Sequence, residues 1–407
     1  MESPLAGLRV LDLSRVVSGP YATRMMADLG AEVVKVETGA DGDQSRYTGV
    51  VIDGDSGMYT QFNVGKSNVS IDLTAPGASD LVLNLVERAD VVAENFRPGV
   101  LTKLGIGAEA MLARNPAVVL LSVSGFGHSG PWTSRRAYAS SAHAEAGLMA
   151  RQAALDNTEP RDLALGAADY FAALHGLVAV VSAIHLRQRT GLGQHIDMSM
   201  FDAMLASDDY AHFYLDDSVD TIARVGGEIW DAQGGPVVLG SVLRNTFGRL
   251  RRTFDLTDGL PADASRSAKD QARARAVQEW MLSFDSRDQL HAALDEARLV
   301  WADIRQPADA LGGELAQARD MVVEIAMADG GRRRVVNSPY RFSNARSGPR
   351  PKVSRRGGDN ERVLRDWIGM SAEEISELYN AGVLGREGVP DEAPSPARWA
   401  SHALKDE

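Results

Sequence analysis

The first half of the chain alternates short apolar runs with amphipathic segments. Five runs with β-branched character predict strands, at 8–13, 32–37, 69–73, 90–94 and 118–124. Amphipathic segments at 21–29 and 78–88 predict helices between them, and Gly30 closes the first. Strands that alternate with helices are typical of a parallel sheet with both faces covered. We therefore expect an α/β fold with a Rossmann-like sheet.

Longer helical patterns follow, at 139–150, 169–188 and 199–215. Residues 170–186 carry no acidic or basic side chain other than histidine. This stretch falls just short of the roughly 18–20 residues that span a bilayer. We expect a buried core helix there.

The pattern changes after the third long helix. Gly- and Asp-rich sequence at 219–235 predicts a linker, and a second unit with helices at 268–284 and 286–297 follows it. A strand is expected at 335–342 and a helix at 361–384, in which Ser371 and Glu374 fit a capping box. The tail after Arg386 is rich in Pro, Glu and Ala and is expected to be mobile.

Composition narrows the function classes. The net charge of −12 argues against nucleic acid as the main partner, because phosphate binding needs a basic surface. The chain has no cysteine, which excludes disulfides and thiolate nucleophiles and fits a reducing compartment. The start, MESPLAGLRV, lacks the basic and apolar regions of a signal peptide. We expect a cytoplasmic protein that does not bind a membrane.

Residues 125–130, GFGHSG, match the glycine pattern of dinucleotide sites. Pro131 and Trp132 follow at once, so no helix is expected to open at Gly130, although pyrophosphate binding needs that helix N-terminus. A tight loop at a strand end is the better interpretation. The histidines show no metal-binding spacing and no G-x-S-x-G is present, which disfavours metal and serine-nucleophile chemistry.

The motif ENFRPG, residues 94–99, stands at the end of a predicted buried strand, where ligands of open α/β sheets bind. Asn95 offers an amide, Phe96 a stacking face, and Arg97 a guanidinium that matches phosphate. An ordinary strand-to-helix turn with Pro98 in the first helical position explains the motif equally well.

Asp169 follows Gly166-Ala-Ala at the start of the long uncharged segment. An acid at a helix start is commonly a cap or a dipole partner. Asp169 is also the last charge before a long apolar stretch, which places it at the edge of a desolvated site. A carboxylate there becomes a better nucleophile.

Several long segments resemble one family across nearly the whole chain. They are PLAGLRVLDLSRVVSGPYAT, LGAEVVKVE, NVGKSNVSIDL, ADVVAENFRPGVLTKLG, NPAVVLLSVSGFGHSGP, RTGLGQHIDMSMFDAML and SPYRFS. They resemble the class III CoA-transferases, the group of formyl-CoA and carnitine CoA-transferases that also includes the α-methylacyl-CoA racemases. The resemblance implies an interlocked homodimer. It implies a large CoA-binding domain over 1–218, a linker and small α/β domain over 219–330, and a C-terminal segment over 331–407 that returns to the large domain.

The resemblance also implies roles for individual residues. Asp169 matches the catalytic aspartate, which would carry coenzyme A between an acyl-CoA donor and a carboxylic acid through anhydride and aspartyl-CoA thioester intermediates. CoA enters as a substrate, and no metal, nicotinamide or flavin is required. Tyr138 and Met200 match residues lining the acyl site. The positions expected to bind CoA, including Arg97 of the ENFRPG motif, are Val16, Val17, Ser18, Lys66, Asn95, Phe96, Arg97, Lys103 and Arg136.

Three departures from the family pattern leave alternatives open. Ala139 stands where an acidic residue is common, Ser67 where an arginine often follows the lysine, and Phe171 where small residues are usual. A racemase of this family would carry a histidine at the position of Tyr138, whose ordinary pKa near 10 suits a base poorly. A CoA-binding protein without turnover is the other alternative. The sequence does not identify the donor or the acceptor acid.

Overall fold

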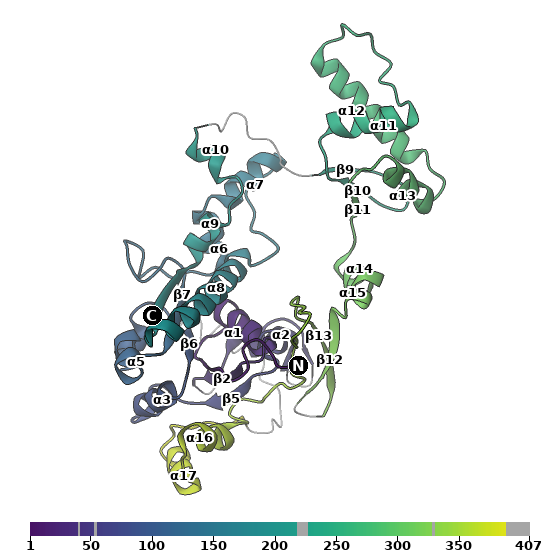
Figure 1. Cartoon of the computed structure of the whole chain (residues 1–407). Coiled ribbons are helices and arrows are strands. Elements are labelled where there is room, and N and C mark those ends of the chain that lie inside the picture. The colour runs from purple at the N-terminus through teal and green to yellow at the C-terminus, as the bar shows by residue number, and fades with distance from the viewer. Residues whose placement is uncertain (40, 53–54, 218–226, 328–329, 388–407) are drawn as a thin grey trace. The chain divides into compact units, whose positions relative to one another are not determined.

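The computed structural model describes residues 1–39, 41–52, 55–217, 227–327 and 330–387. These divide into two compact units (Figure 1). One holds Met1–His212 together with the chain from Arg319 onward, and the other holds Phe213–Ala318. The sequence placed the boundaries at 218/219 and 330/331. Part of the predicted linker, 218–226, and the predicted mobile tail, 388–407, lie outside the described residues.

The first unit is built on a six-stranded parallel sheet in the order β5-β2-β1-β6-β7-β8. Its strands are β1 (Arg9–Asp12), β2 (Glu32–Glu37), β5 (Ser67–Ser70), β6 (Val91–Glu94), β7 (Val119–Ser124) and β8 (Gln194–Ser199). The predicted parallel α/β sheet is confirmed. The sequence missed β8, because this edge strand is mostly exposed and its residues, QHIDMS, lack an apolar run.

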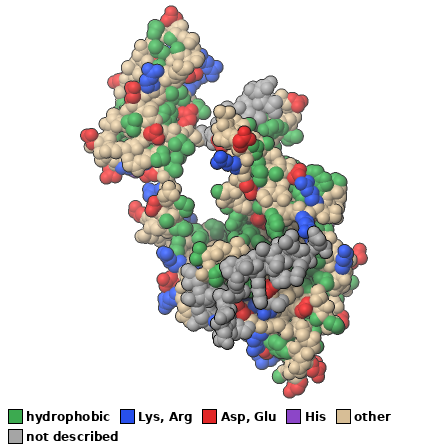
Figure 2. Space-filling model, turned by 180° about the vertical axis from the view of Figure 1, so that it is seen from behind, with side chains coloured by type: hydrophobic (Ala, Val, Ile, Leu, Met, Phe, Trp, Pro, Cys, Tyr) green, Lys and Arg blue, Asp and Glu red, His purple; other side chains and the backbone are tan. Residues whose placement is uncertain are grey.

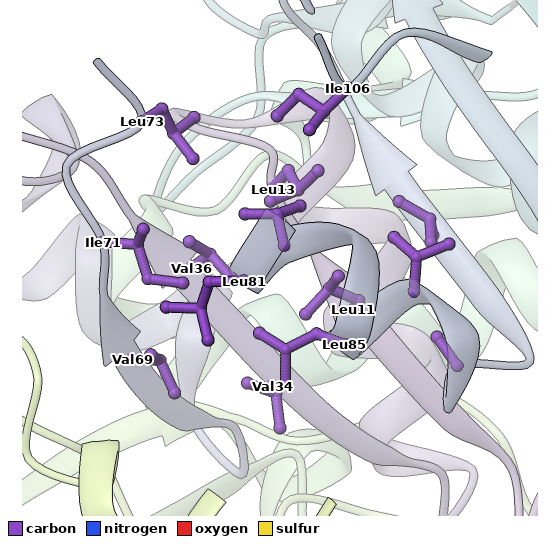
Figure 3. Packing of buried hydrophobic residues seen from close by; sticks show 14 of the residues in the cluster. Leu11, Leu13, Val34, Val36, Val69, Ile71, Leu73, Leu81, Leu85 and Ile106 are labelled. Atoms are coloured by element: carbon purple, nitrogen blue, oxygen red, sulfur yellow. The ribbon is translucent and has the colours of Figure 1, made fainter. Parts of the chain in front are cut away.

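Helices cover both faces of the sheet (Figure 1). Side chains of β1 alternate between the faces, so Val10 and Leu11 belong to different cores. The face of Val10 carries α1 (Ser18–Asp28) and α8 (Ala167–Thr190), and the face of Leu11 carries α3 (Ala78–Glu87), α5 (Ala108–Arg114) and α16 (Asn360–Ile368). Figure 3 shows Leu81 and Leu85 of α3 in the core with Leu11.

Three predicted long helices are each divided in two. Residues 139–150 form parts of α6 (Ala139–Glu145) and α7 (Leu148–Asp156), because Gly147 between them has a φ of 77°, outside the helical range. Gly369 ends α16 in the same way, with a φ of 74°, before α17 (Ala372–Asn380). The third stretch holds α9 (Met200–Ala206) and α10 (Ala211–Leu215).

The predicted capping box at the start of α17 is confirmed. The Glu374 N–H donates to the Ser371 hydroxyl at 3.2 Å, and the Ser371 N–H donates to the Glu374 carboxylate at 2.7 Å. The strand predicted at 335–342 lies earlier, as β13 (Arg332–Val336), and pairs with β12 (Val322–Ala326). The remaining elements of this unit are short: η1 (Gln44–Tyr47), β3 (Val51–Ile52), β4 (Asp55–Ser56), α2 (Gly57–Asn63) and α4 (Val100–Lys103).

The second unit has its own core around a three-stranded antiparallel sheet. The sheet order is β11-β10-β9, and a salt bridge of 2.6 Å joins Arg287 to Asp303 beside it. Of its helices, the sequence missed α11, α14 and α15. The elements are β9 (Glu228–Trp230), β10 (Val237–Leu239), α11 (Leu243–Phe254), α12 (Arg266–Leu282), α13 (Arg287–Glu296), β11 (Trp301–Asp303), α14 (Pro307–Gly312) and α15 (Glu314–Ala318).

The strand order of the large sheet marks where a ligand binds. From β1 the chain passes through α1 to β2 on one side, and it later reaches β6 on the other side of β1. The loops after β1 and β6 therefore leave the carboxyl edge of the sheet where the strand order reverses. In open α/β sheets this switch point forms the ligand crevice.

Helix α8 is the one described helix that is long and apolar enough to cross a membrane by length and composition. Half of its most apolar window is buried, and core helices of soluble proteins pass the same test. Its buried residues pack in the core on the Val10 face of the sheet, as the sequence predicted. Acidic and basic side chains are interspersed over the face of the molecule seen in Figure 2.

Candidate active site

The loop after β1 carries an unusual backbone conformation. Val16 has a φ of 68°, in the left-handed region that β-branched residues rarely enter. Its N–H points at the Asp43 carboxylate, whose oxygens lie 3.1 and 3.2 Å away. Asp43 in turn pairs with buried Lys35 at 2.9 Å, and Lys35 donates to the Ser14 carbonyl at 2.6 Å. Strain of this kind persists where surrounding contacts enforce it, commonly at functional sites.

A second buried ion pair lies beneath the same loop and corrects one sequence expectation. Lys66 was expected to bind CoA phosphates, but its side chain is buried and its ammonium lies 2.9 Å from Asp12 Oδ2. Three further oxygens, from Pro20, Thr23 and Asn63, lie within 3.0 Å of it. An ammonium has three protons, so these partners use all of its donors.

Burial and the neighbouring charges act in opposite directions on the pKa values of Lys66 and Asp12. Burial lowers the pKa of Lys66 to about 8, although Asp12 acts in the opposite direction. Burial alone would raise the pKa of Asp12, but Lys66 and Lys35 outweigh it and hold that pKa at about 2. The Lys66 ammonium therefore pairs with Asp12 inside the protein, which gives Lys66 a structural role.

Asn95 joins the loop after β6 to the loop after β1. Its side-chain oxygen accepts the Arg15 N–H at 2.8 Å, and its amide donates to the Arg15 carbonyl at 2.7 Å and to the Ser18 hydroxyl at 3.2 Å. Gly19 follows, where a Cβ would lie 2.2 Å from Ser14 Cβ. The amide of Asn95 is thus engaged in fixing the two switch-point loops to each other.

The other residues of the ENFRPG motif are arranged differently. Phe96 is buried, and the Arg15 guanidinium lies 5.5 Å from the centre of its ring. Arg97 is exposed. Pro98 does not stand in the first helical position, because Gly99 is the N-cap of α4.

Asp169 lies where two helices begin. It is the third residue of α8, and its carboxylate lies close to Ser18, the first residue of α1. Neither Val17, the N-cap of α1, nor Gly166, the N-cap of α8, supplies a side-chain cap. The carboxylate therefore faces the positive end of α1 while standing in the first turn of α8.

Burial raises the pKa of Asp169 to about 6, whereas Ser18 and the nearby His143 act to lower that pKa. The group is ionised at neutral pH, yet it has lost part of its solvation. A carboxylate in this state is a stronger nucleophile than one in water. The predicted position of Asp169 at a helix start, beside a desolvated region, agrees with the structure.

Sequence reasoning missed two residues beside Asp169. His143, on α6, is buried, and its Nε2 accepts the N–H of Ala168 at 3.1 Å. Its Nδ1 lies 2.8 Å from the Asp162 carboxylate. The positions 143 and 162 follow no motif. Helix α6 packs on α8, and Asp162 lies in the loop that leads from α7 into α8.

The remaining expected residues divide by exposure. Tyr138, the N-cap of α6, is exposed, whereas Met200, the first residue of α9, is buried in the core with Phe171 packed against that core. Lys103 and Arg136 are exposed, like Arg97. Val16 and Val17 are partly buried beside Ser18.

The glycine-rich segment at 125–130 forms a loop, as expected. The Gly127 N–H donates to the Ser124 hydroxyl at 2.9 Å, and the His128 N–H donates to the Asp197 carboxylate at 2.9 Å. The next helix, α6, begins only at Ala139, so the dinucleotide arrangement of loop and helix is not formed. Among the described residues, no group of three or more His, Asp or Glu side chains is placed to hold a metal ion.

The sequence matches the family model for CoA-transferase family III over residues 5–360. The chain belongs to this family. It is an enzyme of the class that transfers coenzyme A between acyl-CoA and carboxylic acids.

Named relatives cover most of the chain. It is 31% identical to a succinyl-CoA:mesaconate CoA-transferase of Haloarcula hispanica, over 79% of this chain and 85% of the relative. It is 28% identical to the succinyl-CoA–L-malate CoA-transferase beta subunit of Chloroflexus aurantiacus, over 94% and 98%. The crystal structure of a CaiB/BaiF family protein from Brucella suis matches with a TM-score of 0.77 and 28% identity, over 90% of this chain and all of that one.

The structural role of Lys66 in this family III CoA-transferase is testable. Lys66→Ala leaves the Asp12 carboxylate buried without its partner, which typically costs about 3–5 kcal/mol. We expect urea unfolding to show a loss of this size in the free energy of unfolding. Lys103→Ala, which removes an exposed ammonium, should change that free energy by less than about 0.5 kcal/mol. Equal stability of the two variants would contradict the assignment.

Proposed function

We propose that the protein transfers coenzyme A through covalent intermediates on Asp169. The observation that carries the proposal is the partly buried Asp169 carboxylate, which lies beside Ser18 at the N-terminus of α1. Two features that a nucleophile needs meet there: a defined position and a reduced solvation shell. Family membership supports turnover, which disfavours the alternative of a CoA-binding protein without catalysis.

In the proposed first step, an Asp169 oxygen attacks the thioester carbon of the donor acyl-CoA. The carbon–sulfur bond breaks, CoA leaves as the thiolate, and a mixed anhydride remains on Asp169. The thiolate then attacks the aspartyl carbonyl carbon, which releases the donor as a carboxylate and leaves an aspartyl-CoA thioester. The acceptor carboxylate attacks this thioester, which expels the CoA thiolate and forms a second mixed anhydride. The thiolate then attacks the acceptor acyl carbon of the anhydride, which gives the acceptor CoA thioester and releases the Asp169 carboxylate.

The Ser18 N–H and hydroxyl suit this sequence of steps. Each intermediate places negative charge on oxygens attached to the Asp169 side chain or to the acyl carbon bonded to it. Donors that lie beside the carboxylate can stabilise such charge, and the N-terminus of α1 adds its dipole. No step requires a metal or a redox cofactor.

The histidines disfavour the racemase alternative. Racemisation next to a thioester needs two bases that can reach the substrate. His143 is near Asp169 in the fold, but both of its ring nitrogens are engaged, by Asp162 and by the Ala168 N–H. Tyr138 occupies the position where the family's racemases carry histidine.

We further propose that the substrates are short dicarboxylic acids and their CoA thioesters, because the relatives described above act on succinyl-CoA with mesaconate or L-malate. The CoA phosphates would contact Arg97, Lys103 and Arg136, which are exposed cationic side chains. Val16, Val17 and Ser18 would line the thiol end, and Tyr138 and Met200 the acyl group. Asn95 and Phe96 would contribute by shaping the loop. A cytoplasmic location fits acyl-CoA substrates.

The decisive experiment concerns Asp169. Asp169→Asn should abolish transfer from succinyl-CoA to mesaconate or L-malate while leaving the fold and CoA affinity intact, because an amide cannot act as the nucleophile. Hydroxylamine added to the wild type during turnover should convert the acylated residue to a hydroxamate, which peptide mass spectrometry should locate at Asp169. For the wild type, kcat/KM should rise with pH through about 6, the pKa at which Asp169 ionises.

Asp202 provides the matched control. It occupies the third position of α9, as Asp169 does in α8, but it is exposed. Asp202→Asn should retain wild-type transfer and the same pH profile. Substantial transfer by Asp169→Asn, or a hydroxamate on another carboxylate, would refute the mechanism.

Phosphate binding has a separate test. Lys103→Ala and Arg136→Ala should each weaken CoA binding by about 10-fold or more in calorimetry, since charge-assisted contacts contribute about 1.5–3 kcal/mol. Turnover at saturating CoA thioester should change little. Arg365→Ala, an exposed substitution on α16, is the control. Unchanged CoA affinity in both variants would remove these residues from the site. Binding of 3′-dephospho-CoA identifies which cation contacts the 3′-phosphate. The variant that lacks this cation should bind 3′-dephospho-CoA as tightly as the wild type does.

The family resemblance also implies a homodimer, which we propose for this protein. The solvent-facing side of α8 supports it, because Leu174, Val178 and Val181 are 39%, 65% and 42% exposed on one helix. Sedimentation at micromolar concentration should show a species of two chains that separates only on unfolding. A folded monomer would contradict the proposal. Val178→Glu should weaken assembly, whereas Arg365→Glu, exposed on α16, should not.

A further inference from the structure

The N-terminus of α8 is held by a side chain from another helix. Helix α8 begins after Gly166, which has no side chain to cap it. The Ala167 N–H donates to the Leu165 carbonyl at 2.7 Å, and the Ala168 N–H donates to His143 Nε2 at 3.1 Å. His143 therefore serves as the missing cap for the second amide of the helix, one residue before Asp169.

This contact requires one form of the imidazole. Because Nε2 accepts a hydrogen bond, it carries no proton, and the ring proton must lie on Nδ1. Nδ1 lies 2.8 Å from Asp162 Oδ1, which is a hydrogen-bond acceptor when ionised. The Asp162 carboxylate also accepts the N–H of Leu163 at 2.8 Å. Asp162 thus selects the tautomer that can cap α8.

We propose that Asp162 and His143 form a positioning pair that orients the Asp169 carboxylate toward the reacting thioester. The proposal rests on the function proposed above. His143 is buried, and both of its ring nitrogens are engaged in hydrogen bonds. It therefore acts through the backbone of α8 and does not touch the substrate. The chain of contacts runs from Asp162 to His143, to the Ala168 N–H, and through the next peptide unit to Asp169.

The geometry explains why a second constraint is needed. Ser18 lies beside the carboxylate end of Asp169, but the Cα end moves with the first turn of α8. Helix ends fray when their amides lack partners. A displacement of about 1 Å in a reacting group can lower a rate about 100-fold. His143 fixes the Cα end, so the two contacts together define the line of attack.

His143→Leu tests the pair because it keeps the apolar volume and removes the acceptor. We expect kcat to fall roughly 10- to 100-fold while CoA affinity stays within about 2-fold of wild type. The rate of Asp169 hydroxamate formation in a single turnover should fall by the same factor. His143→Gln, whose amide oxygen can accept the Ala168 N–H, should recover most of the rate.

Asp162→Ala separates positioning from folding. Its side chain is 48% exposed, so its loss should scarcely change the unfolding temperature. It frees the imidazole to take either tautomer, and we expect an intermediate loss of kcat. In ¹⁵N NMR, the wild type should show His143 protonated at Nδ1 only, and Asp162→Ala should show a mixture. Asp270→Ala, which removes an exposed carboxylate from α12 in the second unit, is the control and should match the wild type.

The outcomes separate the two proposals. If wild-type Asp169 is never acylated, the proposed function fails and the positioning pair fails with it. If wild-type Asp169 is acylated and His143→Leu is acylated at the same rate, only the positioning pair is refuted. A wild-type proton on Nε2 of His143 would refute it as well. A purely structural role would lower the unfolding temperature of His143→Leu without changing the single-turnover rate of its folded fraction, and this result too would overturn the proposal.

Discussion

The approach of the Asp169 carboxylate to the N-terminus of α1 is the interaction on which the rest of the site depends. It brings the first turn of α8 beside Ser18, the first residue of α1, and both helices pack on the same face of the sheet. A carboxylate here complements the positive end of a helix that has no side-chain cap, so the proposed nucleophile also contributes a stabilising interaction to the fold. The partial desolvation that accompanies this position keeps the pKa of Asp169 near 6, where the group is ionised at neutral pH but remains reactive.

The buried ion pairs beneath the loop after β1 make that contact possible. Each of the two pairs, Asp12 with Lys66 and Asp43 with Lys35, joins one negative and one positive side chain, so the two pairs carry no net charge. Buried pairs of this kind are weak sources of stability, because desolvation offsets most of the attraction. Their value here is geometric: Asp43 holds the strained Val16, Lys35 holds the Ser14 carbonyl, and Asn95 fixes Arg15. The loop is thereby shaped so that Ser18 lies beside Asp169.

The sequence predicted the features that depend on local pattern and missed those that depend on packing. Apolar runs located five of the six parallel strands, and the position of Asp169 at a helix start followed from the charge-free stretch after it. The edge strand β8 was missed because an exposed strand needs no apolar run. Lys66 was assigned to CoA by its place in a motif, whereas its burial follows from the packing of β5 against β2 and α2 around Asp12. His143 and Asp162 could not be found from sequence, because a capping acceptor on another helix leaves no spacing to detect.

In the proposed cycle, Asp169 first attacks the substrate and is later attacked by the thiolate. This double role explains why its carboxylate is constrained from two sides. Its carbonyl carbon must present itself along two different lines without leaving the site. A side chain held only through its oxygens would swing about Cα between these steps. Contacts at the carboxylate, from Ser18, and at the backbone, from His143, limit that motion to rotation about the Asp169 side-chain bonds. The meeting of two helix ends supplies both contacts, and this arrangement depends on α6 and α1 as much as on the helix that carries the nucleophile.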